Sequence, residues 1–173
     1  MYLPAALLSK SSMKFLMNSK LKCMKSKIFV EVISYLTILL FLYTSINKII
    51  DFSGFELDIS QSFGWFWGPI ITIAIPAGEI IISIALFIPK FQKIGLYAAL
   101  AMMFAFTLYV GYMLLFLTAH DRPCPCGGII RKMSWPQHLI FNIIFTTLLL
   151  FAVLVKNKIL TSNTLNRTKM SFT

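Results

Sequence analysis

Four long apolar stretches dominate this sequence and limit what it can fold into. They cover about residues 29–47, 69–88, 94–117 and 139–155. Each is close to the length of about 20 residues that an α-helix needs to cross a bilayer. Because lipid offers the backbone no hydrogen-bonding partner, each stretch is expected to be helical. Only 13% of the 173 residues are charged, too few to coat a soluble domain. We therefore predict an all-α integral membrane protein, a bundle of four transmembrane helices.

The basic residues indicate how this bundle lies in the membrane. Twelve of the sixteen lie in the N-terminal arm, in the connection between the second and third stretches, and in the tail. They are Lys10, Lys14, Lys20, Lys22, Lys25, Lys27, Lys90, Lys93, Lys156, Lys158, Arg167 and Lys169. Lys and Arg accumulate on the cytoplasmic side, which predicts that both ends of the chain lie in the cytoplasm (N-in/C-in). No basic soluble domain remains, so lipid and not nucleic acid is the expected partner.

Three regions follow from this assignment. Residues 1–27 are expected to form a basic cytoplasmic arm without regular structure, with Met24 as an alternative start of translation. Residues 28–155 form the predicted four-helix membrane domain, and residues 156–173 form a polar cytoplasmic tail. Cys23 falls in the arm, on the reducing side of the membrane, and receives no role.

The connection between the third and fourth stretches carries a Cys-Pro-Cys loop, predicted on the outer side of the membrane. Cys124 and Cys126 lie there with one proline between them, on the side where thiols can be oxidised. A disulfide across one residue closes a very small ring, so it is expected to be strained and easily reduced. These are the properties of redox-active cysteines. A static or inert pair is one alternative; a metal site is another, because His120, Cys124, Cys126 and His138 are ligand types that copper(I) and zinc prefer.

The fourth helix is expected to begin beside this loop. Ser134 followed by Gln137 has the capping-box pattern. His138 then lies in the first turn, with Asn142 one turn further on the same face. A helix N-terminus and an imidazolium would both stabilise a nearby thiolate, although His138 could equally cap the helix or meet lipid headgroups. Trp135 fits the aromatic belt at the membrane surface.

Glu79 lies near the centre of the second stretch, where an unpaired carboxylate is costly. It is expected to be neutral or to bond a polar partner on another helix. The candidate partners are Tyr109, Thr146 and Asn142. A functional interpretation is a proton relay or the wall of a quinone cavity, and the alternative is a hydrogen bond that packs helices. Lys48 is expected to reach the headgroups or Asp51.

Several of these motifs occur together in one known family. The chain contains Lys48-Ile-Ile-Asp-Phe, Pro-Ala-Gly-Glu79, Cys124-Pro-Cys-Gly-Gly and Ser-Trp-Pro-Gln-His138-Leu-Ile-Phe-Asn. In this combination, over about residues 24–155, it resembles the MauE group of DoxX-like bacterial membrane proteins. The resemblance implies a protein of the bacterial cytoplasmic (inner) membrane with a periplasm-facing Cys-Pro-Cys loop and a role in periplasmic disulfide chemistry. MauE itself is associated with methylamine utilisation, where it supports maturation of the disulfide-rich small subunit of methylamine dehydrogenase.

Carried over to this chain, the resemblance makes Cys124 and Cys126 the exchanging pair, with His138 beside them. The supporting residues are Asn142, Glu79, His120 and Trp135. The predicted function is a membrane thiol–disulfide redox protein with a periplasmic thiol or disulfide protein as its partner. A non-enzymatic assembly or transport factor with a metal-binding loop is the alternative. These residues establish no cofactor, and a quinone near Glu79 is a hypothesis.

Overall fold

The computed structural model of the chain describes residues 10–116 and 134–171. Four helices make up this part: α1 (Lys10–Ile50), α2 (Phe52–Phe87), α3 (Gln92–Phe116) and α4 (Trp135–Ser171). Each contains a segment that is long and apolar enough to cross a membrane. These segments are Met24–Ile50, Phe52–Phe87, Gln92–Phe116 and Trp135–Thr161. The prediction of an all-α, multi-pass membrane protein is confirmed.

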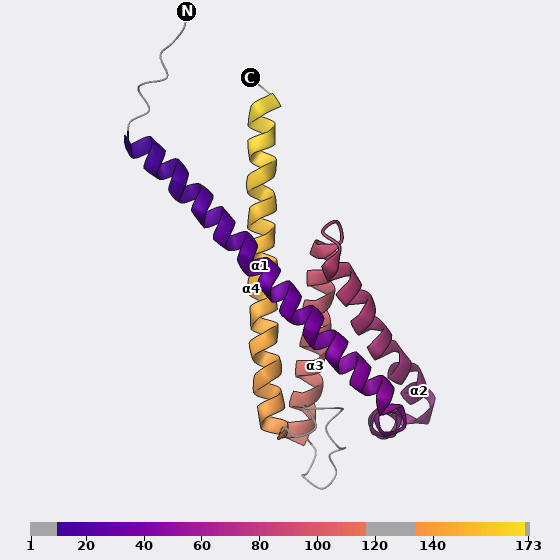
Figure 1. The fold of residues 1–173 in the computed structure, drawn as a ribbon. Helices are drawn as coiled ribbons and strands as arrows, with labels where there is room; N and C mark the ends of the chain where they lie inside the picture. Colours follow the sequence, from indigo (N-terminus) through magenta and orange to yellow (C-terminus); the bar gives the residue numbers. More distant parts are fainter. Residues whose placement is uncertain (1–9, 117–133, 172–173) are drawn as a thin grey trace, which may run out of the picture.

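The four helices pack around one apolar core (Figure 1). α1 lies against α2 and α4, and α3 lies against the same two helices. Phe41, Leu96 and Leu149 are almost completely buried where they meet. Large aliphatic side chains also cover the outside, and Leu39 and Ile81 are 68% and 64% exposed. An apolar surface of this extent is typical of a protein that faces lipid.

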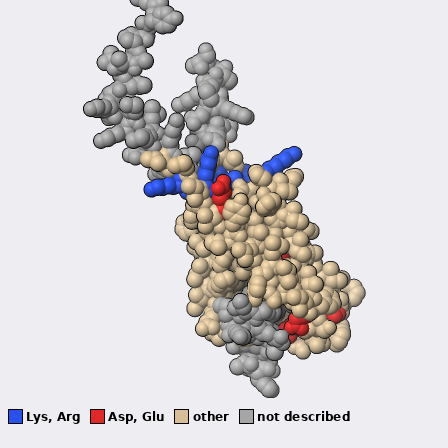
Figure 2. All heavy atoms as spheres, viewed as in Figure 1, with Lys and Arg blue, Asp and Glu red and all other residues tan. Residues whose placement is uncertain are grey.

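Charges separate toward the two ends of the bundle. The start of α1, the end of α4 and the turn between α2 and α3 lie at one end (Figure 1). Lysine side chains gather there, and most acidic side chains in view lie at the opposite end (Figure 2). The lysines described at the first end are Lys25, Lys27, Lys90, Lys93, Lys156 and Lys158. Lysines from three separate parts of the sequence therefore lie together at one end of the folded bundle.

The residues between the first two apolar stretches of the sequence are largely helical as well. Only Asp51 separates α1 from α2, and α2 bends sharply at Gly64, where φ is 83° and ψ is 162°. Only glycine adopts this backbone conformation without strain. Residues 52–63 thus form a separate helical piece, here called the end segment, which lies across the acidic end of the bundle (Figure 1). Two of its own residues, Phe55 and Ile59, are buried against the bundle.

A second glycine allows the end segment to fold back on the rest of α2. A Cβ atom at Gly68 would lie 2.2 Å from Ser60 Oγ and 2.8 Å from Ser60 Cα. Only a residue without a side chain permits backbones to approach this closely. The pair of glycines, Gly64 for the bend and Gly68 for the contact, fixes where the end segment lies.

α1 and α4 are longer than the apolar stretches that predicted them. We expected no regular structure over residues 1–27, whereas α1 begins at Lys10. The predicted polar tail, residues 156–173, is largely a continuation of α4, which ends at Ser171. Hydropathy marks only the part of a helix that lies in lipid, and lysine is a good helix former outside it. The division into an arm, a membrane domain and a tail stays a prediction.

Candidate functional site

The first two turns of α4 carry two of the predicted site residues, His138 and Asn142, at partly and fully buried positions. The Ser134 backbone N–H donates to Gln137 Oε1 at 3.0 Å, and the His138 N–H donates to the Ser134 carbonyl oxygen at 3.0 Å. The predicted start of α4 is therefore confirmed, and the Gln137 side chain makes its bond of the capping box. His138 is half-buried, and Asn142, one turn further on, is only 4% exposed.

A cavity of about 590 Å³ lies in the half of the bundle next to the end segment. All four helices contribute to its walls, which are mostly aliphatic and aromatic. Pockets for small organic ligands have this size and this apolar character, with a few polar groups that fix orientation. The polar groups here are Thr44, Lys48, Glu79, Tyr109, His138 and Asn142.

The cavity brings together four of the residues that the sequence singled out. Glu79 comes from α2, and Trp135, His138 and Asn142 come from α4. The remaining three predicted site residues, His120, Cys124 and Cys126, lie outside the described residues. Sequence reasoning placed Lys48 at the lipid headgroups, and it is the member of the site that this reasoning missed.

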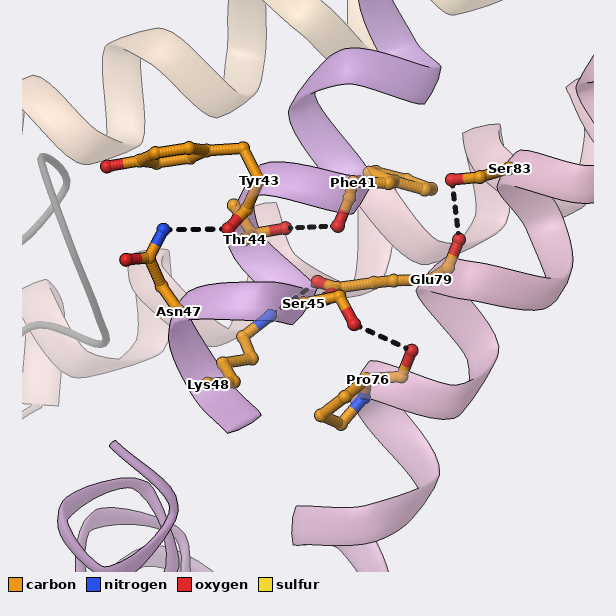
Figure 3. Close-up of polar contacts among 9 residues, drawn as sticks. All are labelled: Phe41, Tyr43, Thr44, Ser45, Asn47, Lys48, Pro76, Glu79 and Ser83. Carbon is orange, nitrogen blue, oxygen red and sulfur yellow. Dashed lines mark hydrogen bonds and ion pairs between the residues drawn. The ribbon is translucent and has the colours of Figure 1, made fainter. Parts of the chain in front are cut away.

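Lys48 and Glu79 form a buried ion pair inside the membrane domain. Lys48 Nζ of α1 donates to Glu79 Oε1 of α2. The two residues are 8% and 1% exposed, and Figure 3 shows their side chains pointing toward each other. A carboxylate at this depth is costly unless it meets a cation or a hydrogen-bond donor, and Lys48 is both. The structure thus corrects the prediction that Lys48 would meet Asp51 or the headgroups.

Two of the three partners predicted for Glu79 make hydrogen bonds to other residues. The Tyr109 hydroxyl lies 3.0 Å from Ser62 Oγ, near the end segment. Thr146 Oγ1 lies 3.0 Å from Thr107 Oγ1, which joins α4 to α3. Asn142 lines the cavity without a hydrogen bond from its side-chain nitrogen to any described residue.

Two aromatic rings hold the Lys48 ammonium group in place. Its Nζ lies 5.6 Å from the centre of the Phe55 ring and 5.1 Å from the centre of the Phe106 ring. A cation over an aromatic face at such distances is attracted by the ring, more strongly where water is excluded. Phe55 belongs to the end segment and Phe106 to α3, so Lys48 links α1 to both parts of α2 and to α3.

A second polar contact fixes α1 against α2 close to the ion pair. Ser45 Oγ donates to the Pro76 carbonyl oxygen at 3.2 Å (Figure 3). Both residues of this contact are buried and lie three positions before the ion-pair residues in their helices. Residues three apart share a helix face, so both contacts hold the same register between α1 and α2.

Three polar atoms of the cavity residues are buried without a hydrogen-bond partner among the described residues. They are Glu79 Oε2, His138 Nδ1 and Asn142 Nδ2. A buried polar atom left unpaired costs about 1–3 kcal/mol, and native proteins rarely leave one without a partner, a water or a ligand. All three atoms belong to side chains that line the same cavity, where a water molecule, a ligand or a residue outside the described ranges can pair with them.

The metal alternative finds no support in the described part of the chain. Within residues 10–116 and 134–171, no three His, Cys, Asp or Glu side chains come together in a way that could hold an ion. Of the four proposed ligands, only His138 lies in these ranges. The alternative therefore stays a prediction.

The fold and the cavity define a multi-pass membrane protein whose four-helix bundle encloses an apolar site with a buried ion pair. The chain belongs to the family described as methylamine utilisation protein MauE, which it matches over residues 26–155. The resemblance seen in the sequence is thereby confirmed. No curated protein and no solved structure matches the chain.

Proposed function

We propose that this protein is a thiol–disulfide redox protein of the bacterial inner membrane that supports disulfide formation or protein maturation in the periplasm. The observation that carries the proposal is a pair of cysteines, Cys124 and Cys126, inside the span that matches the MauE family. The family description associates this span with methylamine utilisation. Maturation of a disulfide-rich dehydrogenase subunit is the task that we expect there.

The exchange proceeds through a mixed disulfide. In one direction, a thiolate of the partner attacks the Cys124–Cys126 disulfide and forms a bond to one of its sulfurs. The second partner thiolate then attacks that bond, which leaves a new disulfide in the partner and a dithiol here. One S–S bond forms for each one that breaks, and two electrons pass from the partner to this protein. The reverse direction uses the same steps.

An N-in/C-in orientation would put this chemistry in the oxidising compartment. The lysine-rich end described above has the character of a cytoplasmic end. α3 starts at that end, after the turn that contains Lys90, and its last residue, Phe116, precedes the segment that contains both cysteines. The charge distribution therefore supports an outer position for Cys124 and Cys126.

This orientation predicts selective labelling in whole cells. A membrane-impermeant maleimide should react with a variant that keeps Cys126 alone and not with a variant that keeps Cys23 alone. Both variants should react after the membrane is permeabilised. Labelling of Cys23 in sealed cells would reverse the orientation and remove the cysteine pair from the periplasm.

The redox activity itself is tested by titration of the cysteine pair in isolated membranes. We expect Cys124 and Cys126, in a Cys23→Ser background, to show a reversible two-electron transition in a maleimide mass-shift assay. Because the small ring strains the bond, the midpoint should lie well above about −300 mV, the range of structural disulfides. Cys124→Ser should abolish the transition. A pair that stays reduced throughout, or that titrates only after a chelator is added, would favour the metal-binding alternative.

A further inference from the structure

We infer that the cavity between the four helices is a binding site for a membrane quinone, with Asn142, His138 and Glu79 as the groups that bind its two oxygen atoms. The existence of a ligand site rests on the geometry. The choice of a quinone among lipid-soluble ligands rests also on the proposed thiol–disulfide function.

The position and walls of the cavity require a lipid-soluble ligand. The cavity lies inside a bundle of membrane-spanning helices, and its walls are largely Leu, Ile, Phe, Met, Val and Ala side chains. Its volume of about 590 Å³ is within the range of about 300–1,000 Å³ that drug-sized ligands occupy. An apolar ring with a hydrocarbon tail fits such walls, whereas a sugar or a nucleotide does not.

Polar atoms of the residues that line the cavity match both forms of a quinone. Asn142 Nδ2 is a donor and can bind a quinone carbonyl oxygen. Glu79 Oε2 is an acceptor, and His138 Nδ1 can act as donor or acceptor. Both can therefore accept a hydrogen bond from an O–H group of a quinol. All three lack a partner among the described residues, and two of their side chains are more than nine-tenths buried.

The charges of the cavity favour a neutral ligand. Lys48 and Glu79 lie side by side, so each largely compensates the field of the other. A fatty acid or a phospholipid headgroup would bring an additional charge into this low-dielectric site, at a high desolvation cost. A quinone and its quinol are neutral and need no counterion.

A quinone takes up as many electrons and protons as the oxidation of a dithiol releases. When two thiols form a disulfide, two S–H bonds break, one S–S bond forms, and two electrons and two protons are released. A quinone takes up the same two electrons and two protons, one proton on each oxygen, to become a quinol. The quinone would thus be the oxidant that the proposed function needs for turnover.

The binding test uses Trp135, which lines the cavity, as the reporter. The chain has three tryptophans, and Trp65 and Trp67 are exposed outside the cavity. The double variant Trp65→Phe/Trp67→Phe therefore leaves one fluorescent indole at the site. We expect a decyl-substituted benzoquinone to quench it in a saturable way in lipid nanodiscs. Asn142→Leu, which removes one donor, should weaken the binding about tenfold.

A matched pair of alanine variants separates binding from partition into lipid. Ala101→Phe puts a bulky ring at a position that lines the cavity from α3, and it should abolish the saturable quenching. Ala74→Phe makes the same change at an exposed position of α2 outside the cavity, and it should leave the quenching unchanged. Three results would overturn the inference. Quenching could rise linearly with the quinone concentration, or it could be equal in the two variants. Mass spectrometry could also find a tightly held phospholipid that prevents the quenching.

The same experiment in a Cys124→Ser/Cys126→Ser background keeps the two proposals apart. Saturable quenching in this background, together with a cysteine pair that never titrates, would refute the thiol–disulfide function and leave the quinone site. A normal cysteine titration without saturable quenching would refute the quinone site and leave the thiol–disulfide function.

Discussion

The variant Lys48→Met is expected to lose about 3–5 kcal/mol of stability, because it leaves Glu79 as a buried charge without its cation. Methionine has nearly the length of the lysine stem, and the rings of Phe55 and Phe106 accept its sulfur. The loss of stability therefore measures the unpaired charge of Glu79 and not an empty space left by a shorter side chain. The measurement is unfolding in mixed micelles with increasing SDS, followed by circular dichroism.

A double-mutant cycle tests whether the loss comes from the pair. Glu79→Gln removes the charge with little change of shape, and the double variant Lys48→Met/Glu79→Gln should recover most of the stability that Lys48→Met loses. Lys90→Met, at an exposed lysine of the turn between α2 and α3, is the matched control and should change stability by less than about 0.5 kcal/mol. Losses that simply add in the double variant would mean that the two residues are not coupled.

Gly68→Ala is expected to destabilise the protein by about 1–3 kcal/mol, the usual cost of overpacking a close contact. Its new methyl group would meet both the hydroxyl group and the Cα atom of Ser60, so a rotamer change of Ser60 cannot relieve the contact. The end segment must move away, and Phe55 with it. We therefore expect a loss of stability together with weaker quinone binding in the Trp135 assay.

A glycine on another helix provides the control, and its replacement by alanine is expected to change the stability in the opposite direction. A Cβ atom at Gly111 of α3 would meet only Leu139 Cδ1, at 4.0 Å, which is an ordinary contact. Because alanine favours a helix over glycine by about 0.5–1 kcal/mol, Gly111→Ala should be neutral or stabilising. Equal effects of the two substitutions would mean that the contact between the end segment and α2 does not matter for stability.

The parts of the fold that the sequence predicted are those set by local patterns. Hydropathy located the four spans, and the Ser134–Gln137 pattern located the start of α4. The end segment was missed because its polar residues, Glu56 and Asp58, and its flanking Gly64 have the character of a loop. Its buried face consists of only Phe55, Ile59 and Ser60, too short a pattern to recognise.

The ion pair was missed for a different reason. Lys48 and Glu79 are separated by 31 positions, and their contact depends on the register between α1 and α2. Helix periodicity fixes which residues share a face but not how far one helix slides along another. One signal was available: an acidic residue within a span requires a partner, and Lys48 was the basic residue nearest to a span on the side predicted to be outer. The clustering of Glu79, His138 and Asn142 around one cavity likewise depends on packing between helices.

The ion pair also has a consequence for how the chain enters the membrane during synthesis. Lysine or an acidic residue near the centre of a lone helix disfavours its insertion by about 2.5–3.5 kcal/mol. α1 brings Lys48 close to its end, and α2 brings Glu79 in its interior, with Asp51 as the only residue between the two helices. In the folded bundle Lys48 neutralises Glu79, so the insertion cost of Glu79 would fall once α1 and α2 are in contact. The translocon would then release α1 and α2 into lipid together as a hairpin, and the nascent chain would acquire its first tertiary contact before α3 is made.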